Sequence, residues 1–214
     1  TAGVAAANTA NHGVQLASSS TVGTVNGNLT VSGTGNGAGS TNRGVDILNT
    51  TVQTSGTGAL TIVGTGTQAS AAGNSNDGVG ISSSLVRTLG TGNLSVTGNG
   101  GTGSKLNMGV RIASAQVRAI GGGTVTVIGI ASGATTGNSN VGVQITGVTS
   151  AVTGAASSLI SGTGGGLTSS LGNLNHGVHI DVSITGANML PTGEVIGDNG
   201  FGAGSLNRSG LYTP

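Results

Sequence analysis

The chain offers few side chains that could do chemistry. Its carboxylates are Asp46, Asp77, Asp181, Glu194 and Asp198, its imidazoles are His12, His176 and His179, and it has no cysteine. Enzymes that cleave polysaccharides bring two carboxylates together for acid–base work, and metal sites gather three or more ligands. Whether these few residues meet depends on how the chain repeats.

A six-residue phrase recurs along the chain. It reads NHGVQL at 11, NRGVDI at 42, NDGVGI at 76, NMGVRI at 107, NVGVQI at 140, NHGVHI at 175 and, degenerately, NRSGLY at 207. A second phrase of the type LTVSG ends at Gly33, Gly64, Gly98, Gly129, Gly162 and Gly197. Each Asn lies 22 residues before its own Gly, whereas the distance from that Gly to the next Asn varies from 9 to 13. This indicates a core of fixed register closed by a variable loop.

Within the core, apolar and polar residues alternate with the period of a half-buried strand. The inward pairs of the first phrase run from Val14 and Leu16 to Val178 and Ile180, and Leu29 and Val31 begin those of the second. A shorter stretch marked by Val52, Val86 and Val117 predicts a third strand. Short strands separated by glycine-rich turns, repeated every 31–35 residues, predict an all-β fold: a parallel β-helix (β-solenoid) of about six coils.

The coils divide the chain into three parts. We expect residues 1–10 to form a partial coil, residues 11–206 a six-coil solenoid, and residues 207–214 a C-terminal cap or junction. In the last copy Ser209 stands where the other copies have Gly. Because both ends of a solenoid are open strand edges, they must be capped, continued by more repeats or paired with another subunit.

Stacking gives the constant letters physical roles. Asn tolerates a left-handed backbone and can form an amide ladder along the axis, which involves Asn11, Asn42, Asn76, Asn107, Asn140, Asn175 and Asn207. The turn glycines supply either positive φ or a close approach between backbones, at Gly13, Gly44, Gly78, Gly109, Gly142 and Gly177. The residue between Asn and Gly is expected to face solvent, at His12, Arg43, Asp77, Met108, Val141 and His176.

The spacing of the acids argues against an active site. Counted from their own Asn, the five carboxylates lie at offsets 4, 1, 6, 19 and 23, so no two share a column, and only Glu194 and Asp198 could meet. Calcium-binding solenoids repeat Asp in every turn, which this chain does not. His176 and His179 have no apparent third ligand. We therefore predict no catalytic residue, no metal site and no cofactor.

Composition narrows the partners. With 45 Gly in 214 residues but only two Pro, the chain is not collagen, and 35% hydrophobic residues with a net charge of +1 argue against disorder. No apolar run is long enough for a membrane helix, and 1% aromatic residues disfavour membrane insertion as a barrel and nucleic-acid binding.

Two surface features suggest ligands. A belt of four cations, Arg87, Lys105, Arg111 and Arg118, could meet an acidic surface polysaccharide. An outward hydroxyl column, formed by Thr30, Thr61, Ser95 and Thr126, is typical of ice-binding solenoids but fails at Leu159 and Glu194.

The motif NxGVxI followed by GTGNLTVxGxG resembles the tandem repeats in the shafts of very large bacterial surface proteins of the filamentous-haemagglutinin type. The resemblance covers residues 11 to about 210 and implies an extracellular or cell-surface, right-handed β-solenoid. We expect a non-enzymatic structural fibre or adhesin shaft that stacks end to end or continues in further repeats. The alternatives are a glycan-binding module that uses the basic belt, and an ice-binding or polysaccharide-cleaving β-helix.

Overall fold

The computed structural model describes residues 9–69, 73–131, 137–165, 175–181, 193–198 and 211–212. These residues form strands and turns without a helix, and every strand pairing is parallel. Sheet A comprises β1 (Val14–Leu16), β4 (Val45–Leu48), β7 (Val79–Ser82), β10 (Val110–Ala113), β13 (Val143–Thr146), β16 (Val178–Asp181) and β18 (Leu211–Tyr212). Sheet B comprises β2 (Thr21–Val25), β5 (Thr51–Ser55), β8 (Leu85–Thr88), β11 (Gln116–Ala119) and β14 (Ala151–Gly154). Sheet C comprises β3 (Leu29–Thr34), β6 (Leu60–Thr65), β9 (Leu94–Asn99), β12 (Val125–Ile130), β15 (Ser158–Thr163) and β17 (Gly193–Asp198).

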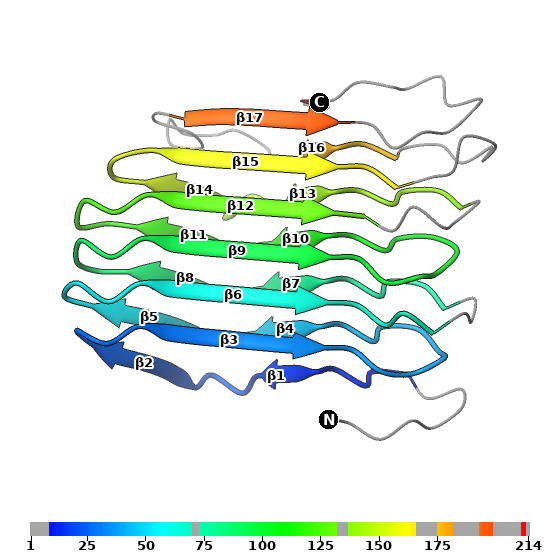
Figure 1. Cartoon of the computed structure of the whole chain (residues 1–214), viewed down its shortest axis with the longest axis horizontal. Coiled ribbons are helices and arrows are strands. Elements are labelled where there is room, and N and C mark those ends of the chain that lie inside the picture. The colour runs from blue at the N-terminus through cyan, green and yellow to red at the C-terminus, as the bar shows by residue number, and fades with distance from the viewer. Residues whose placement is uncertain are drawn as a thin grey trace.

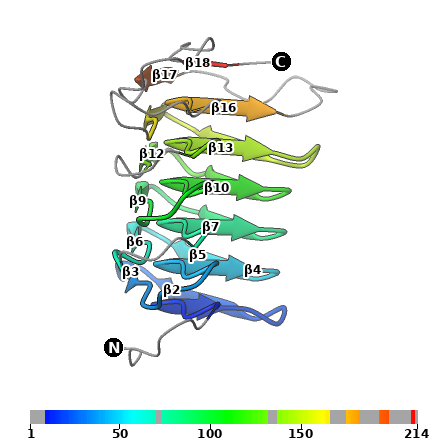
Figure 2. The ribbon, with the colours of Figure 1, turned by 90° about the vertical axis from the view of Figure 1, so that its right-hand side faces the viewer.

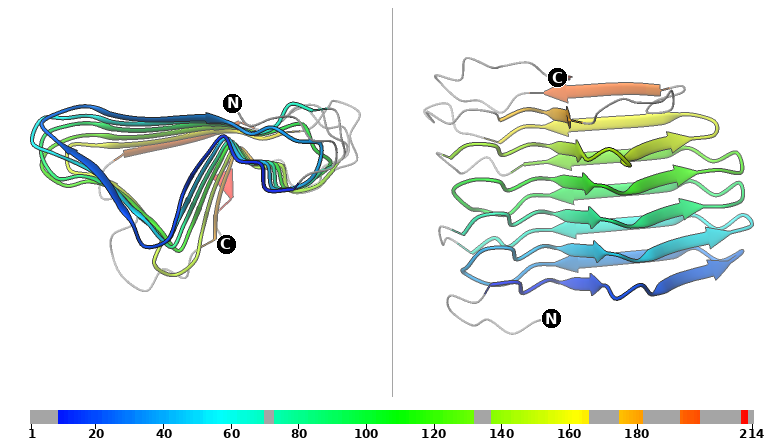
Figure 3. Two further views of the ribbon diagram at one scale, coloured as in Figure 1. Left: turned by 90° about the horizontal axis from the view of Figure 1, so that it is seen from below. Right: turned by 180° about the vertical axis from the view of Figure 1, so that it is seen from behind.

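The chain winds into a stack of coils. Each coil contributes one strand to sheets A, B and C in turn, and the strands lie on those of the coil before (Figures 1 and 2). Seen from the N-terminal end, the chain runs clockwise as it recedes, which is a right-handed coil (Figure 3). The predicted parallel β-helix is therefore confirmed. Five coils are described with all three strands, and β16 and β17 continue sheets A and C.

The three sheets enclose an apolar interior. Val45, Ile47, Val52 and Ile62 of the second coil are all fully buried, and the equivalent residues of the following coils join the same cluster. Val52, Val86 and Val117 lie on sheet B, so the third strand predicted from these valines is present. Successive coils repeat the same inward positions because each strand must pair in register with the next.

The middle strand can slide while the interval of 22 residues from Asn to Gly stays constant. Thr21 lies 10 residues after its Asn but pairs with Thr51, which lies 9 after its own. In the fifth coil Ala151, at offset 11, pairs with Gln116 at offset 9. The turn into sheet C removes the difference, since Val125 and Ser158 pair at the same offset of 18. The fixed distance of 22 residues thus reflects the closed circumference of the coil and not three rigid strands.

That circumference closes where two glycine columns touch, a feature we call the waist. The glycine two residues after each Asn lies against the glycine that is next to last in the strand of sheet C. A Cβ on Gly109 would overlap the backbone of Gly129 and Ile130, and one on Gly98 would overlap the carbonyl of Gly109. None of the column glycines from Gly13 to Gly142 has a left-handed φ. Of the two predicted roles for these glycines, close approach is therefore the one the structure uses.

Beyond the waist the chain forms a second, smaller lobe before it enters the next coil, and this lobe contains the loop of variable length (Figure 3, left). The left-handed residue here is the one before each Asn, with φ of 60° at Ala10, 64° at Thr41, 58° at Ser75, 59° at Leu106 and 61° at Ser139. The expectation that Asn itself takes the left-handed turn is wrong. Asn is instead placed to point its side chain into the lobe.

Substitution at the waist should be far more damaging than the loss of glycine flexibility alone. We expect Gly109→Ala to lower the free energy of unfolding by about 3 kcal/mol or more, because the new methyl group can only displace backbone. Gly27→Ala is the matched control, since its Cβ would lie 3.8 Å from the nearest atom, the Cβ of Thr24. Urea unfolding followed by circular dichroism should show a change within about 0.5 kcal/mol for the control. Equal losses in the two variants would contradict the waist.

Candidate functional surfaces

The repeated Asn side chains fill the lobe. Asn42, Asn76, Asn107 and Asn140 are fully buried, and each Oδ1 accepts the backbone N–H of the Asn one coil earlier. The distances are 2.8 Å from Asn11 to Asn42, 2.8 Å from Asn42 to Asn76, 3.1 Å from Asn76 to Asn107, 3.1 Å from Asn107 to Asn140 and 2.8 Å from Asn140 to Asn175. Asn207 lies outside the described residues.

This ladder differs from the expected stack of amides. Asn107 donates its amide to the next amide oxygen, that of Asn140, at 3.2 Å. Asn42 instead donates to the carbonyls of Gly37 and Gly39 in its own lobe, at 3.3 and 2.8 Å. The acceptor along the axis is thus common to the ladder, whereas a donor across the lobe is supplied by particular members such as Asn42 and Asn140, and the amide nitrogen of Asn76 has no partner among the described residues. The accepted bonds satisfy backbone N–H groups that a dry interior would otherwise leave unpaired.

The alternation predicted that the residue after each Asn faces solvent, and this prediction is wrong. Asp77, Met108, Val141 and His176 are all less than 5% exposed. Asp77 and Met108 line a hollow together with Arg43 and with Arg111 at offset 4, and we call this hollow the notch. Asp46, also at offset 4, joins it through its ion pair with Arg43. The alternation along the strand gave the direction of these side chains but not the neighbouring lobe that covers them.

Charges cross the notch from coil to coil. Arg43 bridges Asp46 in its own coil, from Nη1 to Oδ1 at 2.7 Å, and Asp77 in the next, from Nε to Oδ2 at 3.0 Å. Arg111 approaches the same Oδ2 of Asp77 at 3.4 Å. His12 lies 3.7 Å from Asp46. A pair at offsets 1 and 4 of adjacent coils therefore meets in space, although these positions belong to different columns.

Burial sets the protonation of the notch. It lowers the pKa of His12 below its ordinary value of 6.5, and Asp46 only partly opposes the shift. Neutral His12 fits the geometry, since its Nδ1 accepts the backbone N–H of Arg43 at 3.3 Å. Burial has the opposite effect on the acid: it raises the pKa of Asp77, and the charges of Arg43 and Arg111 only partly oppose this shift. Burial also lowers the pKa of His179. A cavity of about 260 Å³ beside these charges is lined in part by Ser75, Leu106 and Gln144.

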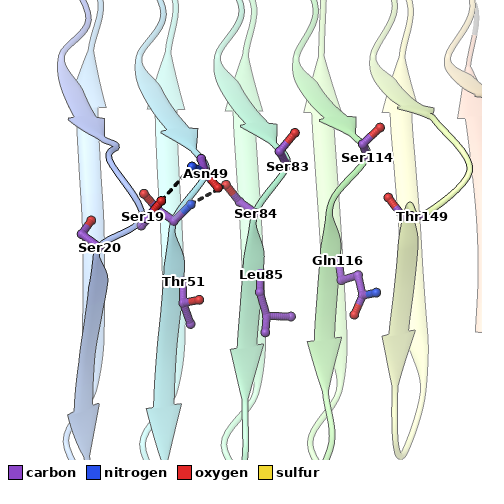
Figure 4. A pocket seen from close by; sticks show the side chains of 11 residues that line it. Ser19, Ser20, Asn49, Thr51, Ser83, Ser84, Leu85, Ser114, Gln116 and Thr149 are labelled. Carbon is purple, nitrogen blue, oxygen red and sulfur yellow. Dashed lines mark hydrogen bonds between the residues drawn. The ribbon is translucent and has the colours of Figure 1, made fainter.

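A second surface, which we call the corner groove, runs along the turn from sheet A to sheet B. It has a volume of about 590 Å³ and crosses all five described coils (Figure 4). Its lining is hydroxyl and amide side chains with one apolar exception: Ser19, Ser20, Asn49, Thr50, Thr51, Ser83, Ser84, Leu85, Ser114, Gln116 and Thr149. The sequence analysis missed this groove, although runs such as ASSST, LNTT and SSSL after the strands of sheet A carried the signal.

The four cations of the proposed belt do not lie on one surface. Arg87 and Arg118 are register partners on the outer face of sheet B, beside the corner groove. Arg111 lies in the notch and is paired with Asp77, whereas Lys105 is exposed on the lobe. The structure thus brings together two of the four.

The other sequence expectations are placed as follows. The hydroxyl column of Thr30, Thr61, Ser95 and Thr126 is in register on sheet C. The backbone of Glu194 and Asp198 lies on β17, but their side chains fall outside the described part. Within the described ranges, no three His, Cys, Asp or Glu residues are grouped so as to hold a metal ion. Nor is there, in the same ranges, a helix long and apolar enough to cross a membrane.

Comparison of the chain with protein-family models, with curated proteins and with solved structures gave no match in any of the three. The β-solenoid of stacked parallel coils stands on the structure itself.

The Asn ladder predicts a position-dependent cost. Asn107→Ala removes the acceptor of the buried Asn76 N–H, so we expect a loss of about 1–3 kcal/mol in the free energy of unfolding. Asn93→Ala is the matched control, because the Asn93 Oδ1 accepts the Thr124 N–H at 3.0 Å on an exposed turn where water can replace it. Chemical denaturation should show a loss below about 1 kcal/mol for the control. The ladder would have no special role if both substitutions cost the same.

The notch predicts a pH dependence that His12 should carry. Because the folded pKa of His12 lies below the ordinary value of 6.5, its contribution to stability is present above pH 6.5 and is lost as pH falls through the folded pKa. Between about pH 7.5 and about pH 5, the wild type should therefore lose more stability than His12→Gln. The raised pKa of Asp77 acts in the opposite direction, but it is common to both proteins. Denaturation midpoints at the two pH values measure the difference, and parallel changes would refute the assignment.

Proposed function

We propose that this chain is a section of the shaft of an extracellular or cell-surface fibre, of the filamentous-haemagglutinin-like kind that its repeated phrase resembles. The observation that carries the proposal is the uniform stack. Three parallel sheets run through the coils, and every described coil presents the same hydrogen-bonding edge to the next. Because each coil contacts only its neighbours, additional coils of the same kind lengthen the stack without changing any existing contact.

The first described coil supports continuation beyond itself. Val14, Leu16 and Leu29 are only partly buried, whereas Val45, Ile47 and Leu60 at the same positions one coil later are fully buried. Another coil placed against this edge would bury the apolar side chains and pair the open strands β1, β2 and β3. Further repeats of the same polypeptide or a second copy of the chain would supply it equally well.

Two of the three carboxylates whose side chains the structure describes support a non-enzymatic role, and the third, Asp181, is exposed at the end of β16. Asp46 and Asp77 are both buried and both paired with Arg43, so neither is placed to attack a substrate or to activate water. Their arrangement is that of charges that fasten neighbouring coils together.

Electron microscopy of the purified chain tests the proposal. If copies stack, rods should lengthen with protein concentration, and Val22→Lys should stop this growth because it places a charge inside the open edge. Thr21→Lys is the matched control, because it adds the same charge to the same strand at a residue that is exposed. If the shaft is instead one polypeptide, the encoded precursor should contain further copies of the phrase. Particles of constant length together with a precursor that lacks further copies would reject the shaft.

A further inference from the structure

The corner groove presents polar groups that the protein does not use. Thr51 is half-buried while Ser83 and Ser114 are exposed, and within the described residues their hydroxyls make no hydrogen bond to the protein. Ser84, by contrast, is buried and bonded to Ser82 and Ile47. The groove therefore has a structural floor and three free hydroxyls, one in each of the second, third and fourth coils, which follow one another at the stacking distance of about 4.8 Å.

Two of these hydroxyls are held at a conformational cost. The residue seven positions after each Asn is left-handed, with φ of 71° at Ser18, 50° at Asn49, 49° at Ser83, 51° at Ser114 and 91° at Gly147. Gly or Asn occupies such a backbone at little cost, and both occur in this column. Serine is not favoured there for conformational reasons, yet Ser83 and Ser114 place it at the groove. Strain that is retained in this way points to a use for the side chain.

Two cations lie beside this row without a countercharge. Arg87 and Arg118 are directly opposed on β8 and β11, a like-charge arrangement that destabilises a sheet. Arg87 donates twice to Gln53 Oε1, at 3.0 and 2.9 Å, and Arg118 donates to Gln116 Oε1 at 3.2 Å. Neither arginine forms an ion pair with a carboxylate in the described part of the chain, although Arg43 and Arg111 both do.

We propose that the corner groove binds an extended acidic polysaccharide that lies along the axis of the stack. Its hydroxyl groups would exchange hydrogen bonds with Thr51, Ser83 and Ser114, and its anionic groups would pair with Arg87 and Arg118. Leu85 offers an apolar contact for a sugar face. The five coils give the groove a length of about 20 Å, which suits a linear chain of several sugars. This inference goes beyond the shaft role and does not depend on it.

The chemistry of the groove favours this ligand over other polyanions. Nucleic acid binding without aromatic platforms for the bases would be unusual, and the groove contains no aromatic residue. An acidic peptide usually adds to an open strand edge, whereas this groove is lined by outward side chains of paired strands. Carboxylates and sulfates both suit the paired guanidinium groups, so the anionic group can come from a uronic acid or a sulfated sugar.

The test is binding of the full chain to five probes by isothermal titration calorimetry at two salt concentrations. They are a linear uronic-acid polymer, a sulfated glycan, a neutral dextran, polyglutamate and single-stranded DNA. We expect salt-sensitive binding to the uronic-acid polymer, the sulfated glycan or both. The stronger of the two identifies the anionic group. Binding to dextran, polyglutamate or DNA as strong as to the glycans would overturn the proposal.

Two sets of variants locate the binding. Arg118→Gln should weaken it at least about tenfold, whereas Lys105→Gln, which removes the same charge from an exposed position on the lobe, should not. The double change Ser83→Gly and Ser114→Gly removes two hydroxyls and relieves two left-handed serines, so this protein should be no less stable than the wild type while it binds more weakly. Unchanged binding in the serine variant, or equal loss of binding in the two charge variants, would show that the ligand binds elsewhere and would reject the corner groove as its site.

Discussion

Contact between two backbones at the waist shapes the whole coil. Because Gly109 and Gly129 touch without side chains, the loop of chain between them must close over a constant length, and the sheets that it contains must enclose a core of constant section. Everything outside the waist is released from that constraint. The lobe can therefore vary from coil to coil in length while the three sheets keep their register. A methyl group on either glycine would force the two backbones apart where the sheet-lined core and the lobe adjoin.

The two interiors solve different problems with different residues. The three sheets bury Val, Ile and Leu, for which water is the unfavourable environment. The lobe consists of loop backbone, whose N–H and C=O groups find too few partners among themselves, and Asn supplies both a donor and an acceptor there. Asp would supply only acceptors and would bring a buried charge. Repetition multiplies either choice, so a poor residue at one position would be poor in every coil.

Repetition also explains why charge is scarce. A charged residue at one offset faces the same offset a few ångströms away in the next coil, and like charges there repel. In the notch, Arg43, Asp77 and Arg111 alternate in sign across successive coils, which turns the repulsion into attraction. Arg87 and Arg118 break this pattern. In a solenoid whose other columns avoid or pair their charges, two adjacent arginines without a carboxylate partner are an exception. Such exceptions to the rules of folding are expected at functional surfaces.

The sequence predicts the features that repeat in every coil, because periodicity encodes only these. The interval from Asn42 to Gly64 gave the register, and the alternation of Val45 and Ile47 gave the inward face, because both are properties of one coil repeated. The burial of Asp77 and Met108 could not be read this way, since it depends on the path of the lobe, which has no periodic signal. The meeting of Arg87 with Arg118 is a column, since each lies 11 residues after its own Asn, and periodicity does encode it. The corner groove is different, because its shape requires the angle between two sheets. In a stacked fold, columns are written in the sequence, whereas surfaces arise where different columns meet. Function that depends on such a meeting is therefore visible only once the cross-section of the coil is known.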